Sequence, residues 1–68
     1  MKLILSKHAV EQARARGVSI DEVKDAVQKG AKHLQGNKIV SDYGYIRVVY
    51  KKLEEECFII TVMVRKGD

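Results

Sequence analysis

His8 is the side chain of this sequence best placed to move a proton. It lies in the first turn of a predicted helix, where His8, Gln12 and Arg16 recur every four residues and so form one ridge. Histidine donates or accepts protons near neutral pH, and an arginine on the same ridge could hold a phosphate group. The ridge borders the apolar stripe of the helix, so an ordinary packing or surface role for His8 stays open.

Arg47 is the second candidate because it interrupts an apolar and aromatic segment, Tyr45 to Tyr50. Inside a strand it needs an anion, or it pairs with a surface carboxylate on a solvated face of the sheet. The predicted catalytic set is therefore His8, Arg16 and Arg47. Four more side chains on or beside the strands could stack on a base or bind the rest of a substrate: Tyr43, Tyr45, Thr61 and Arg65.

Neither a metal nor a cofactor is expected. His8 and His33 are 25 residues apart and Cys57 stands alone, which is no metal-binding motif. The acidic group at 21–25 is explained by its place in the first turn of a helix, where the helix dipole favours acids. There is no phosphate-binding glycine loop, nucleophile elbow or pair of catalytic carboxylates.

Composition indicates one domain over residues 1–68, with 46% hydrophobic and 32% charged residues. The formal net charge of +4 favours polyanionic partners such as RNA or an acidic protein. The longest apolar run, Cys57 to Val64, has eight residues and is broken by Thr61, against the roughly 20 residues that a membrane helix needs. We therefore expect a protein that does not enter a membrane. A single cysteine forms no intrachain disulfide, which favours the cytoplasm.

Local signals predict two short helices followed by strands. Ser6 and Gly17 bound a helix over 7–16, and Ser19 with Glu22 forms a capping box that starts a second helix, ended by Gly30. Strands are expected over 38–41, 45–51 and 56–65, with turns at 36–37, 42–44 and 52–55. Short strands at 3–5 and 31–35 are open alternatives.

This order predicts an α+β fold in which the two helices pack on one face of a three- to four-stranded antiparallel sheet. Strict alternation would place Tyr45 on the same face as Arg47. It would divide the last strand into two faces: Phe58, Ile60, Val62 and Val64 on one, and Cys57, Ile59, Thr61, Met63 and Arg65 on the other. Both faces are largely apolar, which suggests that a second copy, a partner chain or a ligand covers one of them. A homodimer is the simplest expectation.

Several of these segments resemble a small uncharacterised bacterial and archaeal family. The family pattern is roughly S-x-H-A, then R-G-[IV]-S, then E-[IV], and the matching segments here begin at Ser6, Arg16 and Glu22. The segments 45–50 and 59–62 resemble its two main strands. The resemblance extends from about Leu5 to Val64.

The resemblance implies a RelE-like fold, because this family is linked to the RelE-like toxins, compact ribonucleases that are often paired with an antitoxin. It implies roles for His8, Arg16, Arg47 and Thr61. The leading hypothesis is thus a toxin-related endoribonuclease that needs no metal, with an acidic antitoxin-like partner. Two alternatives remain: a non-catalytic module that binds nucleic acid or protein, and a small dimeric protein whose apolar strand face is its subunit interface.

Overall fold

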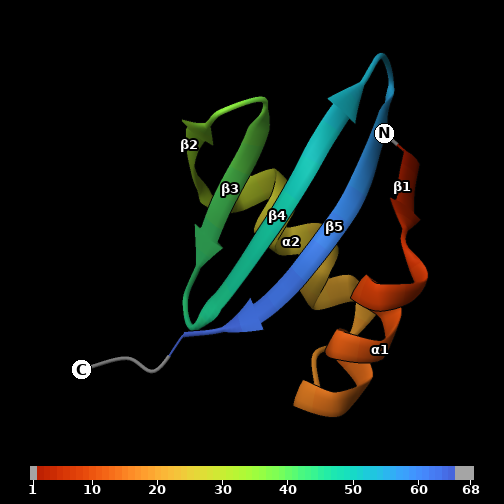
Figure 1. Ribbon diagram of the computed structural model, residues 1–68. Helices are drawn as coiled ribbons and strands as arrows, with labels where there is room; N and C mark the ends of the chain where they lie inside the picture. Colours follow the sequence, from red (N-terminus) through yellow and green to blue (C-terminus); the bar gives the residue numbers. More distant parts are fainter. Residues whose placement is uncertain (1, 66–68) are drawn as a thin grey trace.

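The computed structural model contains one mixed five-stranded sheet and two helices (Figure 1). The structure describes residues 2–65. The elements in chain order are β1 (Lys2–Leu5), α1 (Lys7–Arg16), α2 (Ile20–Lys29), β2 (Ala31–Gln35), β3 (Lys38–Tyr43), β4 (Ile46–Leu53) and β5 (Glu56–Val64). The predicted α+β class, both helices and the three main strands are confirmed.

The helix boundaries follow the predicted caps. Ser6 Oγ accepts a hydrogen bond from the Ala9 backbone N–H at 3.0 Å, and α1 ends at Gly17, whose φ of 69° is the left-handed conformation that glycine favours. At α2 the capping box is complete: Ser19 Oγ accepts from the Glu22 N–H at 3.1 Å, and the Glu22 carboxylate accepts from the Ser19 N–H at 2.9 Å.

The sheet differs from the prediction in strand number and direction. Its order is β1-β5-β4-β3-β2, with antiparallel pairs throughout except that β1 runs parallel to β5. Both optional strands are present, so the expected three to four antiparallel strands become five in a mixed sheet. The parallel pairing of β1 is possible because α1 and the elements after it separate it from β5, whereas strands joined by a hairpin must be antiparallel.

The outer edge of β5 is closed by β1 and then by α1. Ser6 N–H donates to the Ile59 carbonyl at 3.1 Å just where β1 ends. One and a half turns further along α1, Gln12 Oε1 accepts from the Val62 N–H at 3.0 Å. A side-chain amide thus replaces a strand partner, and α1 runs alongside β5 with Ser6 near Ile59 and Gln12 near Val62.

A β-bulge in β5 corrects the predicted faces of that strand. The register passes from Val49↔Thr61 to Tyr50↔Ile59, which leaves Ile60 as the extra residue. Strict alternation predicted Ile59 and Val62 on opposite faces, but both are fully buried in the same core. Before the bulge the odd-numbered side chains face the helices, and after it the even-numbered ones do.

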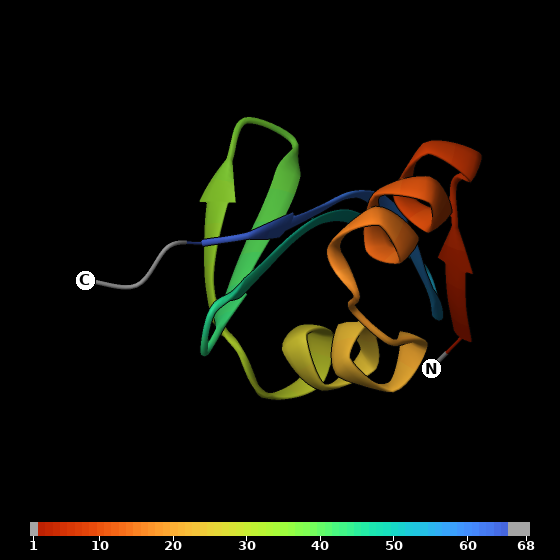
Figure 2. The same cartoon turned by 90° about the horizontal axis from the view of Figure 1, so that it is seen from below.

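The helices and the sheet share one core. α2 contributes Val23, Ala26 and Val27 and packs against β3 and β4, whereas α1 contributes only Ala9 and Ala13 and packs against β5 and β1. Figure 2 shows α2 beneath the sheet and α1 beside β5, at the end of the sheet opposite the β2–β3 hairpin. Small alanine side chains let α1 approach β5 closely enough for Gln12 to reach its backbone.

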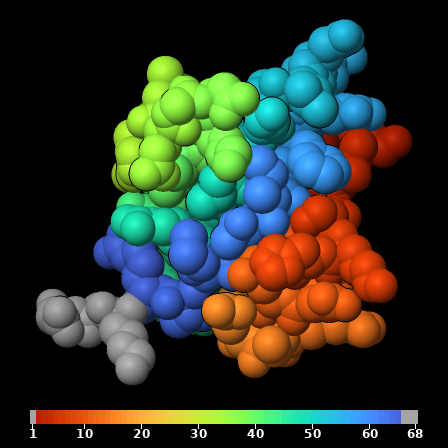
Figure 3. Space-filling view, viewed as in Figure 1, coloured from red at the N-terminus to blue at the C-terminus, as the bar shows by residue number. Residues whose placement is uncertain are grey.

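We call the sheet surface on the side away from α2 the open face; Figure 3 looks onto it. Alternation and register assign its side chains, because Ile46, Val48 and Tyr50 of β4 point into the core. Its residues are Lys2, Ile4, Ala31, His33, Gln35, Lys38, Val40, Asp42, Arg47, Val49, Lys51, Leu53, Glu56, Phe58, Thr61, Met63 and Arg65.

The apolar side chains of the open face are partly shielded within this one chain. Val40 is 2% exposed, and Val49, Phe58 and Met63 are of intermediate burial. The apolar character of β5 on both faces therefore does not by itself demand a second copy, and the homodimer stays a prediction.

Replacing Gly30 with alanine should destabilise the fold. An added Cβ would overlap Ser41 Oγ and the Ala26 carbonyl, where the Ser41 hydroxyl donates to that carbonyl under the first residues of β2. We expect Gly30→Ala to lower the free energy of unfolding by about 2 kcal/mol or more, measured by urea denaturation. Gly36→Ala is the control: it meets open space and only its positive φ opposes the change, so about 1 kcal/mol is expected. Equal stability of the two variants would contradict the tight contact at Gly30.

Gln12→Leu tests whether the amide seals the edge of β5. Leucine preserves size but leaves the part-buried Val62 N–H without its acceptor, which should cost about 1–3 kcal/mol of unfolding free energy. Hydrogen exchange at Val62 should accelerate more than at Val48. Glu11→Leu, on the exposed side of the same helix, is the matched control; a Gln12→Leu variant as stable as this control would show that the bond adds nothing.

Candidate functional site

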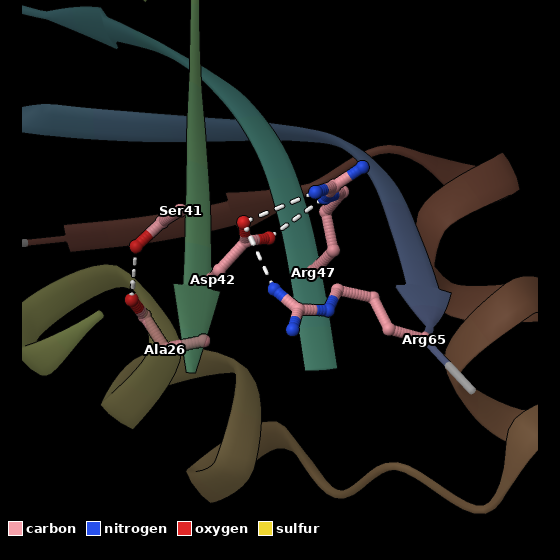
Figure 4. A network of polar contacts seen from close by, with 5 residues as sticks. All are labelled: Ala26, Ser41, Asp42, Arg47 and Arg65. Carbon is pink, nitrogen blue, oxygen red and sulfur yellow. Dashed lines mark hydrogen bonds and ion pairs between the residues drawn. The ribbon is translucent and has the colours of Figure 1, made fainter. Parts of the chain in front are cut away.

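Two arginines converge on one carboxylate on the open face. Arg47 Nε lies 2.7 Å from Asp42 Oδ1, and Arg47 Nη2 lies 3.1 Å from Oδ2. Arg65 Nη1 lies 3.0 Å from the same Oδ2. Figure 4 shows both guanidinium groups turned toward Asp42, while the neighbouring Ser41 points to Ala26 on the other side of β3. We call Asp42, Arg47 and Arg65 the arginine cluster.

The β3–β4 turn creates the cluster. Gly44, with φ 58°, and Tyr45 form a two-residue turn, so Asp42 and Arg47 become directly opposed cross-strand partners. Arg65 is held beside them because its backbone N–H donates to the Tyr45 carbonyl at 2.6 Å, just after β5 ends. Three residues from three separate segments therefore meet at one corner of the sheet.

The cluster fixes the charge states of its members. The hydrogen bond from Arg47 is the largest cause that lowers the pKa of Asp42 below its ordinary value, and the charges of Arg47, Arg65 and His33 lower it further against the opposing effect of burial. Asp42 in turn raises the pKa of Arg47. With one carboxylate and two guanidinium groups ionised, the cluster carries a net positive charge.

Other basic side chains extend this charge along the open face. Lys38 and Lys51 join the two arginines, and the second acid of this face, Glu56, lies at the opposite end of β5 from the arginine cluster. The side chains of Arg47 and Arg65 are 39% and 42% exposed, against 17% for Asp42. Water and solutes thus reach the guanidinium groups, whereas the carboxylate lies beneath them.

The structure places His8 and Arg16 on α1, beside β5 and away from the arginine cluster. Both are exposed. Gln12, between them on the same ridge, touches the backbone of β5, so the ridge follows the seam between α1 and that strand. β5 lies between this seam and Arg47 on β4. The predicted catalytic set is therefore divided between two elements on either side of β5.

The predicted binding residues are also divided. Thr61 lies on the open face opposite Val49, and Arg65 belongs to the arginine cluster. Alternation predicted Tyr45 on the same face as Arg47, and this prediction is wrong. Tyr45 lies in the β3–β4 turn, and its hydroxyl donates to Glu22 Oε2 at 3.1 Å. This bond raises the pKa of Tyr45. The pKa of Glu22 is lowered chiefly by the hydrogen bond from the Ser19 backbone N–H, and the bond from Tyr45 lowers it further. Tyr43 is exposed at the end of β3.

Sequence reasoning missed Asp42 and His33. The sequence predicts a turn over 42–44, and a residue in a turn has no cross-strand partner, so the pairing of Asp42 with Arg47 is not predicted. Had Gly44-Tyr45 been taken as a two-residue turn, the opposite charges at 42 and 47 would have predicted the pair. The face of His33 had no local signal, because it depends on the register of β2 against β3.

Within residues 2–65, no group of three or more His, Cys, Asp or Glu side chains could hold a metal ion. A surface hollow at the β4–β5 turn is lined by residues 53–56, none of them a candidate. No helix in the described part of the chain is long and apolar enough to cross a membrane.

The chemistry available at the arginine cluster is anion binding. Each guanidinium has five N–H donors, so the bonds to Asp42 leave donors on both arginines for a second anion. Arginine suits a phosphate because its planar fork matches two phosphate oxygens. Asp42 already holds the two long arginine side chains in place, so binding an anion costs them less conformational entropy.

Comparison with known proteins gives one match. The family model described as "Domain of unknown function (DUF4258)" matches residues 5–64. Neither the curated proteins nor the solved structures give a match.

Asp42→Asn should change how stability depends on pH. A carboxyl with a lowered pKa in the fold stabilises it above about pH 4, and this contribution disappears as the pH falls through the folded-state pKa. We expect Asp42→Asn to cost about 1 kcal/mol at pH 7, since exposure of the arginines weakens the pairs, and its difference from the wild type to shrink as the pH falls below about 4. Urea unfolding at pH 2 to 7 measures this. Glu55→Gln makes the same charge change in an exposed turn. If it lowered the free energy of unfolding by the same amount, the net charge of the protein and not the arginine cluster would explain the loss.

Proposed function

Because this chain belongs to the DUF4258 family, whose description states no function, we propose a function from the site: a RelE-like, toxin-related domain that cleaves RNA without a metal ion. The observation that carries the proposal is the arginine cluster, in which two guanidinium groups are fixed at one carboxylate on a basic, uncovered sheet face. The element order, in which β1 precedes two helices and four further strands follow them, is compatible with this proposal.

RNA suits such a site because it carries its own nucleophile. The 2′-oxygen attacks the adjacent phosphorus and loses its proton to a base, while the bond from phosphorus to the 5′-oxygen breaks and that oxygen gains a proton. The products are a 2′,3′-cyclic phosphate and a 5′-hydroxyl. The protein must move protons and stabilise charge that grows on the phosphate.

The proposed roles follow from the chemistry of each side chain. Arg47 and Arg65 bind the phosphate. Thr61 lies on the same face and is proposed to contact the RNA strand next to that phosphate. His8 is the proposed acid or base, and Arg16 adds positive charge along the seam between α1 and β5. Tyr43, exposed beside the cluster's turn, is proposed to stack on a base. Tyr45 is engaged with Glu22, which makes it the weakest member of the set.

A second candidate is binding without cleavage. It is favoured by the position of α1, which turns Gln12 and not His8 to the backbone of β5 and keeps β5 between His8 and Arg47. An acidic, antitoxin-like protein or RNA would then bind the same open face and compete for it. Binding of either would weaken as salt rises, because the contacts replace small counterions.

Cleavage of RNA in EDTA tests the proposal. Purified protein is incubated with a fluorescent single-stranded RNA, and products are checked for a 2′,3′-cyclic phosphate end. We expect Arg47→Gln and Arg65→Gln to lower the cleavage rate about 100-fold each through lost phosphate stabilisation, and His8→Ala to lower it by a similar factor.

Arg14→Gln is the control for charge, since it is an exposed arginine of α1 outside the ridge. Thermal unfolding of each variant separates loss of activity from loss of fold. Salt-sensitive binding that Arg47→Gln abolishes, with no cleavage by the wild type, would select the binding module. Absence of both would remove the open face as a nucleic-acid site.

A further inference from the structure

β2 brings a second imidazole to the open face. His33 pairs with Val40, and Asp42 follows Val40 by two residues on β3, so His33 and Asp42 are diagonal neighbours on the same side of the sheet. Diagonal neighbours have Cα atoms about 7–8 Å apart, within reach of a histidine side chain. The charge of His33 is also among the causes that lower the pKa of Asp42, after the larger effect of Arg47.

The surroundings of His33 on this face are mainly basic. Lys38 and Asp42 flank it on β3, Arg47 follows on β4, and Arg65 follows β5, while Ala31 and Gln35 on β2 itself are uncharged. Asp42 thus faces an imidazole on one side and two guanidinium groups on the other. A phosphate held by the arginines would lie at the carboxylate that His33 also faces.

The two histidines differ in their access to this position. His8 lies on α1, and β5 separates α1 from the strand that carries Arg47. His33 is diagonal to Asp42 across a single strand pair, and β2 is exposed along its whole length, so solvent can exchange protons with the imidazole. One strand thus separates each histidine from the strand of Arg47, but His33 lies on the open face, diagonal to the carboxylate that both arginines contact.

We infer that His33, in place of His8, is the base of the proposed reaction, with the arginine cluster holding the phosphate, which leaves His8 outside the proton transfer; the inference rests on the proposed RNA cleavage. The proton of the 2′-hydroxyl passes to a ring nitrogen of His33 as the 2′-oxygen bonds to phosphorus. The bond from phosphorus to the 5′-oxygen breaks, and that oxygen takes a proton from water. His33 then returns its proton to solvent, which closes the cycle.

His33→Gln is the test, with Lys32→Gln as its matched control. Lys32 is the adjacent residue of β2 on the opposite face, so its replacement removes a positive charge from the same strand without touching the site. Rates are measured in EDTA between pH 5 and 8.5, and binding is measured with DNA of the same sequence, which lacks the 2′-hydroxyl. His8→Gln is measured in parallel.

We expect His33→Gln to lower the cleavage rate at least 100-fold at pH 8 and to bind the DNA within twofold of the wild type. A base must start neutral, so the wild-type rate should fall as the pH falls below neutral, and His33→Gln should lose this dependence. Lys32→Gln should stay within threefold of the wild type with an unchanged pH profile.

The outcomes separate the two proposals. If the wild type cleaves RNA and His33→Gln cleaves equally with the same pH profile, His33 is not the base and the proposed function stands. If His8→Gln alone removes the pH dependence, the base is His8 and the inference is overturned. If the wild type cleaves at no pH, the proposed function and this inference fall together.

Discussion

The backbone of β5 must find hydrogen-bond partners along both of its edges, and most of the architecture follows from this requirement. β4 pairs with one edge throughout, but the four-residue β1 is too short to pair with the whole of the other. Ser6 and Gln12 of α1 complete it. Because buried backbone N–H groups are costly when unpaired, this arrangement fixes α1 beside β5, and with it the ridge that carries His8 and Arg16.

The same strand determines which side chains reach the open face. The bulge at Ile60 lets Ile59 and Val62 both enter the core, so Thr61 and Met63 emerge on the side of Arg47. Past the end of the strand, Arg65 reaches Asp42 from that side. The arginine cluster thus depends on local chain geometry at the β3–β4 turn and on a shift of alternation in β5.

Local interactions could be predicted from the sequence and long-range ones could not. The capping box at Ser19, the glycine at 17 and the turn at 36–37 act over four residues or fewer, and each is present in the structure. The parallel pairing of β1 and the acceptance of the Val62 N–H by Gln12 join residues about 50 positions apart, and no neighbouring residue signals them. The bulge lies within one hairpin, but it depends on which side chains of β5 the core admits. For the site, the pattern identified Arg47 and Arg65 but neither their carboxylate nor the imidazole on β2.

Charge decides what the open face is suited to contact. Its apolar side chains lie between basic ones, so a ligand that covers this face meets guanidinium and ammonium groups as well as carbon. A second copy placed face to face would bring like charges together, which opposes association unless counterions intervene. A polyanion meets the same groups with favourable energy and releases counterions as it binds. If the chain forms a dimer, the electrostatics therefore favour a surface other than this one, because a dimer through the open face would bury the cluster and the proposed site with it.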